Sequence, residues 1–306
     1  MSARLTNKIM SVKEAVESFV FDGATIGMGG QSIARVPMAI THEIVRQEKR
    51  NLTIQGCNLA MSMDLLVGAG LVKRTEAGTG NLERFGTTFQ WRRAIETGQI
   101  QHRDYSHLAM VSRFMAGEMG LPFMPTKSLL GSDILNKHLD GADGYTIIDN
   151  PWGEHEPVAL LPAATPDVAI IHAQRVDELG NVMVQGFAVH DVEMVRAAKE
   201  TIVTCEEVVS SEDTRRNPEL TSIPYLYVSA VVEQPFGGHP TSVYRYYDYD
   251  SDHVDYYQTV AREGGERYQE YLHRYILDCE SFNEYLEKIG GAQKTHSLHQ
   301  AMLKML

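Results

Sequence analysis

The sequence predicts an α/β protein in which helices cover both faces of a mostly parallel or mixed sheet, a three-layer α/β/α arrangement. Segments with helical and with strand-like hydrophobic spacing alternate along the chain. Several strand candidates, such as residues 168–171, are unbroken apolar runs, which are typical of strands buried on both faces. The chain has 306 residues, of which 43% are hydrophobic, and contains no internal repeat or low-complexity linker. We therefore expect residues 1–306 to form a single α/β domain.

The first elements follow from short local signals. Ser11 and Glu14 have the spacing of a capping box, which predicts a helix from about Val12. Asp22 and Gly23 indicate a turn, and residues 24–28 then form a short buried strand that leads into a glycine-containing loop. Pro37 suits the first turn of the next helix, and the strand after it lies at residues 52–54.

The same alternation continues to the last strand candidate. Prolines 122 and 125 exclude a helical interior at residues 121–125, because proline has no N–H to donate. We expect Asp191 to cap the helix at 192–199. The other expected elements are a short helix ending within 65–70, a strand at 72–76, a helix at 89–98, strands at 158–161 and 168–171, a turn at 177–181 and a strand at 201–204.

The composition excludes some classes of binding partner and predicts a cellular compartment. The net charge is −12 without a basic patch, which argues against binding to nucleic acid or to an anionic membrane. The first ten residues lack the apolar run of a signal peptide, and no stretch of about 18 apolar residues occurs, so we expect a cytoplasmic protein. The three cysteines, Cys57, Cys205 and Cys279, are widely spaced, which indicates buried thiols and neither disulfides nor a metal site.

Tyrosine is concentrated near the C-terminus. Twelve of the 14 tyrosines lie between Tyr225 and Tyr285. Tyrosine is common at protein interfaces. The acidic residues at 248–252 indicate an exposed loop, which would leave the tyrosine rings in contact with solvent unless a partner covers them. We therefore expect residues 225–290 to form a partner interface. The alternative is that a C-terminal helix over 254–289 packs its tyrosines on the chain's own sheet.

Two glycine-containing segments are the main candidates for a binding site. Gly29, Gly30 and Gln31 follow the first strand and could bring backbone N–H groups close to an oxygen of a ligand. Ser32 stands where a dinucleotide-binding fingerprint requires its third glycine, which argues against a nicotinamide site. The plainer interpretation is that these glycines only allow a helix to cross the strand.

The second segment is expected to be a loop after the strand at 72–76. Its candidate binding residues are Gly78, Thr79, Gly80 and Asn81. Loops beyond the carboxyl ends of parallel strands are where ligands bind, so the two segments would form a site if they face one crevice.

The sequence contains no self-sufficient nucleophile. Glutamates that could act as acid or base occur at position 118, in Glu154-His155-Glu156 and in Glu206-Glu207, but none has a Ser or Cys partner at an informative spacing. Structural roles are the better interpretation for each of them. His172 is expected to be a satisfied core histidine, and His239 a loop residue of undefined role.

Several segments, taken in order, resemble the A (alpha) subunit of family I coenzyme A transferases of the glutaconate CoA-transferase type. The resemblance covers nearly the whole chain, with Gln31 in place of the family's usual Phe and Arg35 in place of its usual Gly. The matching segments are Asp22-Gly23 with Gly29-Gly30 and Arg35-Val36-Pro37; Gly120–Pro125; Asp167–Gln174 with Gly180-Asn181; and Thr201–Glu207 with Gly238-His239-Pro240 and Tyr247–Asp250.

The resemblance implies a NagB/RpiA/CoA-transferase-like fold and explains the missing nucleophile. In this family a glutamate of a B (beta) subunit, within an S-E-N-G type motif that this chain lacks, attacks an acyl-CoA and carries CoA to a carboxylate acceptor. This chain would then carry no catalytic residue and would use coenzyme A as a substrate, with no resident cofactor or metal. It would pair with a B subunit, in an α2β2 heterotetramer.

The resemblance also implies roles for the site residues. Gly29, Gly30 and Gln31 would donate to an oxygen that develops negative charge. Arg35 would either hold structure or bind the distal carboxylate of a dicarboxylic acyl group. The segment from Gly78 to Asn81 would line the acyl pocket.

Two alternatives stay open at this point. Related A subunits serve in ring-cleaving hydrolases and in decarboxylases; in the ring-cleaving branch the chemistry uses an acidic residue of this subunit type, and a rough alignment puts His107 at that position. The second alternative is a metabolite-sensing module of the same fold, although no basic helix-turn-helix segment accompanies it.

Overall fold

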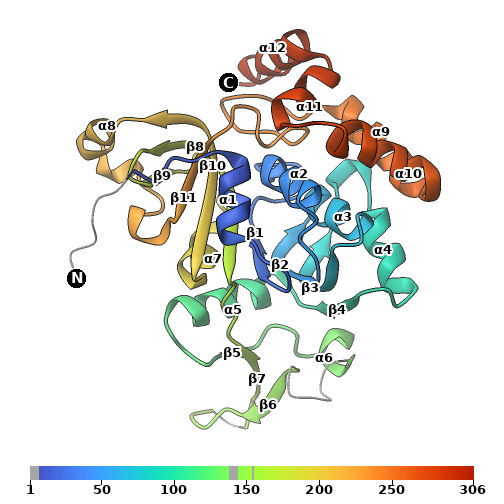
Figure 1. Ribbon diagram of the computed structural model, residues 1–306. Coiled ribbons are helices and arrows are strands. Elements are labelled where there is room, and N and C mark those ends of the chain that lie inside the picture. Colours follow the sequence, from blue (N-terminus) through green and yellow to red (C-terminus); the bar gives the residue numbers. More distant parts are fainter. Residues whose placement is uncertain (1–6, 138–143, 154) are drawn as a thin grey trace.

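The computed structural model describes residues 7–137, 144–153 and 155–306 (Figure 1). Within these ranges, a central sheet has the strand order β11-β10-β8-β1-β2-β3-β4, with each neighbouring pair parallel and the short β9 antiparallel to β8. The α/β prediction is confirmed. The strands are β1 (Thr25–Met28), β2 (Leu52–Leu59), β3 (Val72–Gly80), β4 (Gln101–Asp104), β8 (Val168–Asp177), β9 (Val182–Met183), β10 (Glu200–Val209) and β11 (Ala230–Glu233).

Helices cover both faces of this sheet, as predicted. Successive residues of a strand point to opposite faces, so Val168 and Ile170 of β8 join one buried cluster while Ala169 and Ile171 join the other. The first face is covered by α1 (Val12–Phe19), α2 (Met38–Arg46), α3 (Met61–Gly68) and α4 (Phe89–Glu96), and the second by α5 (His107–Glu118) and α7 (Asp191–Ala197).

Of the two helix N-caps predicted from short sequence motifs, one is confirmed and one is wrong. The capping box of α1 is present, because the Ser11 hydroxyl accepts from the Glu14 N–H at 3.2 Å and the Glu14 carboxylate accepts from the Ser11 N–H at 2.9 Å. The expected cap of α7 is wrong. His190 holds the N-cap position, and Asp191 is the first helical residue with its carboxylate engaged elsewhere.

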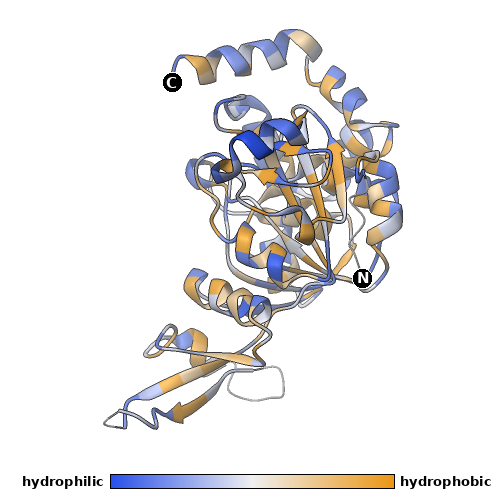
Figure 2. Cartoon of the chain, turned by 90° about the vertical axis from the view of Figure 1, so that its left-hand side faces the viewer, coloured by the Kyte–Doolittle hydropathy of each residue, from blue (hydrophilic) through white to orange (hydrophobic). Residues whose placement is uncertain are grey.

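A second, smaller sheet projects from the body of the molecule (Figure 2). It is antiparallel, in the order β5-β7-β6, so the proline-rich segment at 121–125 is not helical, as predicted. Figure 2 shows that its strands carry many hydrophobic residues. This part contains β5 (Phe123–Thr126), α6 (Asp133–Lys137), β6 (Thr146–Asp149) and β7 (Pro157–Pro162).

The C-terminal region forms several helices instead of one. Gly264, at the C-cap of the first of them, has a φ of 69°, and the helix ends there because a positive φ does not continue an α-helix. The helices are α9 (Ser251–Glu263), α10 (Gly265–Leu272), a π-helical turn (His273–Leu277), α11 (Phe282–Lys288) and α12 (Gly291–Leu303). They follow α8 (Ser211–Arg216) and short 3₁₀ turns at Pro218–Leu220 and Tyr225–Tyr227; a further 3₁₀ turn lies at Glu83–Phe85.

Half of the clustered tyrosines are buried within the chain, so the interface prediction is wrong for these rings. Tyr257 shows how they are used: its hydroxyl donates to Asp64 of α3 at 2.6 Å, and its ring centroid lies 5.3 Å from that of Tyr271. For the exposed Tyr227, Tyr244 and Tyr256 the interface stays a prediction. The buried rings are Tyr247, Tyr257, Tyr268, Tyr271, Tyr275 and Tyr285.

A search of the described residues for membrane-spanning segments found no helix with the length and apolar character to cross a bilayer.

Candidate functional site

The candidate site lies where the strand order of the central sheet changes direction. From β1 the chain proceeds outward on one side through β2, β3 and β4, and on the other side lie β8, β10 and β11. In open α/β sheets, ligands bind beyond the carboxyl ends of the strands at such a switch point. The segment that follows β1, residues 29–35, lies at this point, and β2 and β3 end beside it.

The two glycines of this segment are required for packing. A Cβ atom on Gly29 would lie 2.6 Å from Ile171 Cγ2, and one on Gly30 would lie 2.5 Å from the Arg35 carbonyl oxygen. Gly30 also has a φ of 76°, a conformation that favours glycine. These contacts support the plainer structural interpretation for both residues.

The predicted backbone donors are already in use. The Gly29 N–H donates to Ile170 O at 2.9 Å, the Gly30 N–H to Asp191 Oδ1 at 3.1 Å and the Gln31 N–H to Ala34 O at 2.9 Å. The expectation that these backbone groups face a ligand is therefore wrong. The Gln31 side chain is different, because its buried Oε1 atom has no hydrogen-bond partner among the described residues.

The second glycine segment belongs to a strand and is not a loop. Strand β3 continues to Gly80, since Thr79 and Gly80 pair with Asn58 and Leu59 of β2. A Cβ on Gly78 would lie 2.5 Å from His107 Cδ2, and one on Gly80 would lie 2.7 Å from the Trp91 ring. The glycines thus admit neighbouring rings at the carboxyl end of β3.

The two segments nevertheless meet, which is the condition that the sequence sets for a shared site. Ser32 Oγ lies 3.2 Å from Asn81 Oδ1, which joins the residue after β3 to the segment after β1. Asn58 of β2 completes this polar cluster, with Nδ2 2.5 Å from Ser32 Oγ. Sequence reasoning missed Asn58 because an Asn inside a buried strand carries no motif, although its polarity in an apolar run is the signal that could have found it.

One backbone N–H group determines which atoms of this cluster donate and which accept hydrogen bonds. The Glu83 N–H donates to Asn81 Oδ1 at 3.1 Å, so that atom is an acceptor and the Ser32 hydroxyl must donate to it. Ser32 Oγ then accepts from Asn58 Nδ2, which leaves Asn58 Oδ1 buried without a partner among the described residues. Ser32, Asn58 and Asn81 are here called the amide cluster. Since the oxygens of an acyl or carboxylate ligand accept hydrogen bonds, the groups of this cluster that suit them are the remaining N–H groups of the Asn58 and Asn81 amides.

His107 stands at the edge of the same site. It is the first residue of α5, its ring is exposed, and its Nε2 atom lies 3.2 Å from Thr79 Oγ1. Cys57 lies behind it, with Sγ 3.7 Å from the His107 carbonyl oxygen. Burial raises the pKa of the Cys57 thiol to about 12, which favours the protonated thiol over the nucleophilic thiolate.

Arg35 is buried and makes three side-chain hydrogen bonds within the chain. Its Nη1 atom donates to Asp191 Oδ2 at 2.8 Å and to His172 O at 3.0 Å, and its Nη2 atom donates to Phe187 O at 2.7 Å. Arg35 nevertheless borders a small cavity of about 250 Å³. Of the two roles left open for Arg35, these contacts support the structural one. The cavity is lined by Ala34, Arg35, Gln185, Gly186, Phe187, Ser242 and Tyr244.

The described glutamates considered as acids or bases have structural partners. Glu118 pairs with Arg196 at 2.8 Å, and Glu207 accepts from the Tyr246 hydroxyl at 3.0 Å. Glu206 is buried and accepts from His172 Nε2 at 2.7 Å. His172 is thus the satisfied core histidine that the sequence predicts.

Glu154, Glu156 and His239 are the other candidates from the sequence. Glu156 pairs with Lys127, whereas Glu154 lies outside the described residues. His239 also proves to be a core group: it is buried, and its ring nitrogens lie 2.6 Å from the Tyr285 hydroxyl and 3.1 Å from Asp250 Oδ2.

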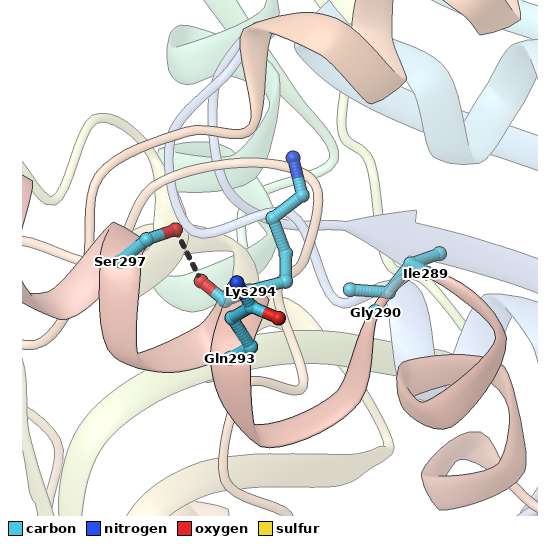
Figure 3. A pocket seen from close by; sticks show the side chains of 5 residues that line it. All are labelled: Ile289, Gly290, Gln293, Lys294 and Ser297. Carbon is cyan, nitrogen blue, oxygen red and sulfur yellow. Dashed lines mark hydrogen bonds between the residues drawn. The ribbon is translucent and has the colours of Figure 1, made fainter.

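Another cavity lies far from these residues in the sequence, between α11 and α12. It is lined by five residues from Ile289 to Ser297 (Figure 3). The cation among these five, Lys294, pairs with Asp250 at 3.0 Å and with Asp252 at 3.4 Å. This lysine therefore connects α12 to the start of α9, and its charge is already committed within the chain.

Comparison with known proteins gives a consistent result. The family model for coenzyme A transferase matches residues 9–234. An uncharacterised protein of Archaeoglobus fulgidus is 39% identical over 98% of this chain, which spans only 66% of that protein's length. The A subunit of glutaconate CoA-transferase from Acidaminococcus fermentans is 34% identical over 94% of this chain and 93% of its own. The A subunit of 3-oxoadipate CoA-transferase from Pseudomonas knackmussii is 32% identical over 92% of this chain and 98% of its own.

Solved structures agree with the sequence relatives. The crystal structure of glutaconate coenzyme A-transferase from Acidaminococcus fermentans superimposes with a TM-score of 0.89 at 33% identity, covering 95% of each chain. A variant of the decarboxylase AibA/AibB gives a TM-score of 0.77 at 29% identity over 88% of this chain and 98% of its own. A cholesterol ring-cleaving hydrolase subunit of Mycobacterium tuberculosis is 27% identical over 85% of this chain and 90% of its own.

Proposed function

Because the chain belongs to the coenzyme A transferase family, we propose that it is the A subunit of an enzyme that moves CoA from an acyl-CoA to a carboxylate acceptor. The single observation that supports this division of labour is the composition of the site. Neutral hydrogen-bonding residues meet at the carboxyl ends of β1, β2 and β3, while the nearby cysteine is a protonated thiol and the described candidate glutamates are engaged in structural contacts. The attacking group then comes from a B subunit.

The proposed reaction proceeds through the glutamate of that B subunit. Its carboxylate attacks the thioester carbonyl carbon, the C–S bond breaks, and CoA leaves as a thiolate from an acyl-glutamyl anhydride. The thiolate attacks the glutamyl carbonyl, which releases the first carboxylate and leaves a glutamyl-CoA thioester. An acceptor carboxylate reverses these steps and departs as the new acyl-CoA.

This chain supplies a binding wall in the proposal. The amide N–H groups of Asn58, Asn81 and Gln31 donate to the oxygens of the acyl group, and Gly78 to Asn81 line the acyl pocket beside His107. Enclosing the pocket between two subunits excludes water, which would otherwise hydrolyse the thioester.

The substrate class follows from the relatives. Glutaconate and 3-oxoadipate, which give two relatives their names, are dicarboxylates, so we propose a dicarboxylic acyl group. Coenzyme A is a substrate, with no resident cofactor or metal. The proposed assembly is an α2β2 heterotetramer in the cytoplasm, formed by one domain over residues 1–306, with the exposed tyrosines of residues 225–290 at a subunit interface.

Trapping of the covalent intermediate tests this proposal. The chain is co-expressed with the product of the adjacent gene, incubated with acyl-CoA, treated with hydroxylamine or borohydride, and analysed by mass spectrometry. We expect modification of one glutamate of the partner and none of this chain. Modification of this chain, or full turnover by this chain alone, would contradict the proposal.

A hydrolase or decarboxylase is the second candidate, supported by the ring-cleaving and AibA/AibB relatives. His107 stands where the ring-cleaving branch is expected to carry an acidic residue, which argues against the hydrolase. The identity of the residue in the partner's nucleophile loop separates these functions. A glutamate there supports the transferase, and any other residue supports hydrolysis or decarboxylation.

A further inference from the structure

The carboxylate of Asp191 lies where three parts of the chain meet. It is fully buried and accepts from the Gly30 N–H at 3.1 Å through Oδ1 and from Arg35 Nη1 at 2.8 Å through Oδ2. Arg35 in turn donates to carbonyl oxygens of His172 in β8 and Phe187 in the segment before α7. The ion pair thus ties residues 29–35 to β8 and to the start of α7.

The segment held in this way needs an external constraint. Gly30 and the two non-glycine residues Ser32 and Arg35 have positive φ values of 76°, 49° and 53°, and this conformation is unfavourable for residues with a Cβ. A buried charge without a partner is also costly, so Asp191 and Arg35 each require the other. The backbone of residues 29–35 is therefore held by groups outside it.

We infer that Asp191 is a positioning residue for the site. It accepts from the backbone of Gly30 and from the side chain of Arg35, and Gln31 and Ser32 lie directly after the backbone group that it holds. Removing its charge weakens the contact at Gly30 and the side-chain contact of Arg35, while the backbone bonds of Ile33 and Arg35 to Ser242 remain. Ser32 then loses its alignment with Asn58 and Asn81, and preorganised contacts to the acyl group weaken.

The test compares Asp191→Asn with Asp177→Asn. Asp177 is equally buried and accepts three hydrogen bonds in the turn between β8 and β9, from Leu179 N and from the N and Nδ2 atoms of Asn181. This control therefore loses a buried carboxylate of similar hydrogen-bonding capacity outside the segment. Amide hydrogen exchange, the melting temperature, kcat and KM are measured for the full chain with its B subunit.

The single oxygen of Asn can accept from only one of the two donors, and the charged Arg35 guanidinium is the stronger, so the NH2 group turns toward Gly30. In Asp191→Asn we therefore expect the Gly30 amide to exchange at least tenfold faster, while the Gly29 amide, bonded to Ile170 O, stays protected. We also expect kcat/KM to fall at least tenfold further than in Asp177→Asn at a similar loss of melting temperature. Equal activity in the two variants, or unchanged exchange at Gly30, would overturn the inference.

A second variant covers the case in which Asp191→Asn does not fold. Arg35→Lys keeps a positive charge opposite Asp191 but cannot reach both His172 O and Phe187 O, so we expect an intermediate loss of kcat/KM with an intact ion pair. Wild-type activity in Arg35→Lys would contradict the inference. The kinetic measurement depends on the proposed function, whereas the hydrogen-exchange measurement does not. If the wild-type complex transfers no CoA, the proposed function is refuted, and the exchange rate of the Gly30 amide still tests whether Asp191 positions the segment.

Discussion

At the scale of single residues, the amide cluster depends on one hydroxyl. Ser32 accepts from Asn58 and donates to Asn81, so Ser32→Ala leaves two amide groups without their shared partner. Groups of this kind are worth about 1–3 kcal/mol when left unpaired in a buried site, which corresponds to roughly a tenfold to hundredfold loss in kcat/KM. Steady-state kinetics of the complex measures this loss in kcat/KM. Ser297→Ala on α12 is the control, and an equal effect of both substitutions would contradict the role of the cluster.

Arg35 allows a prediction about specificity. Its guanidinium is committed to Asp191 and to two carbonyl oxygens, so Arg35→Ala should lower the affinity for dicarboxylic and monocarboxylic acyl-CoAs equally. The same change should cost about 3–5 kcal/mol of stability, because it leaves the buried Asp191 charge without a partner. Ligand titration and denaturant unfolding measure the two effects. A selective loss for dicarboxylic acyl-CoAs would show instead that Arg35 reaches the acyl group.

At the scale of elements, Asp64 connects three helices. It lies on α3, accepts from the Trp91 N–H of α4 at 2.7 Å and accepts from the Tyr257 hydroxyl of α9 at 2.6 Å. Burial raises its pKa to about 6, although both hydrogen bonds act in the opposite direction. The stabilising contribution of its protonated form is thus present below the unfolded-state value of 3.8 and is lost as the pH rises through about 6.

Asp64→Asn should remove this pH dependence. Between about pH 4 and pH 8 the free energy of unfolding of the wild type should fall relative to that of Asp64→Asn, by about 3 kcal/mol from two pKa units. Denaturant unfolding across this pH range gives the difference between the two proteins. A constant difference would mean that the carboxyl group keeps an ordinary pKa in the folded protein.

At the scale of the whole molecule, the proposed partner makes the active unit. The exposed Tyr244 borders the cavity at Arg35 and is 45% exposed, so Tyr244→Asp should weaken association with the B subunit by tenfold or more if the exposed tyrosines form the interface. Analytical ultracentrifugation or biolayer interferometry measures the dissociation constant. Gln99→Glu, on the exposed surface just after α4, is the control and should leave the dissociation constant unchanged.

The sequence by itself determined the α/β class, the capping box of α1, the buried strands and the lack of a self-sufficient nucleophile. These depend on residue spacing and type within about ten positions, where local propensity and hydrophobic period act. The tertiary structure decided what the polar groups of the site do. Asp191 caps no helix because Arg35, 156 positions away, claims its carboxylate; the Gly29, Gly30 and Gln31 N–H groups are taken by other residues; and six tyrosines face the core. Buried polar groups must be hydrogen-bonded, and the partners of these groups lie far away in the sequence. Only the folded chain brings those partners together.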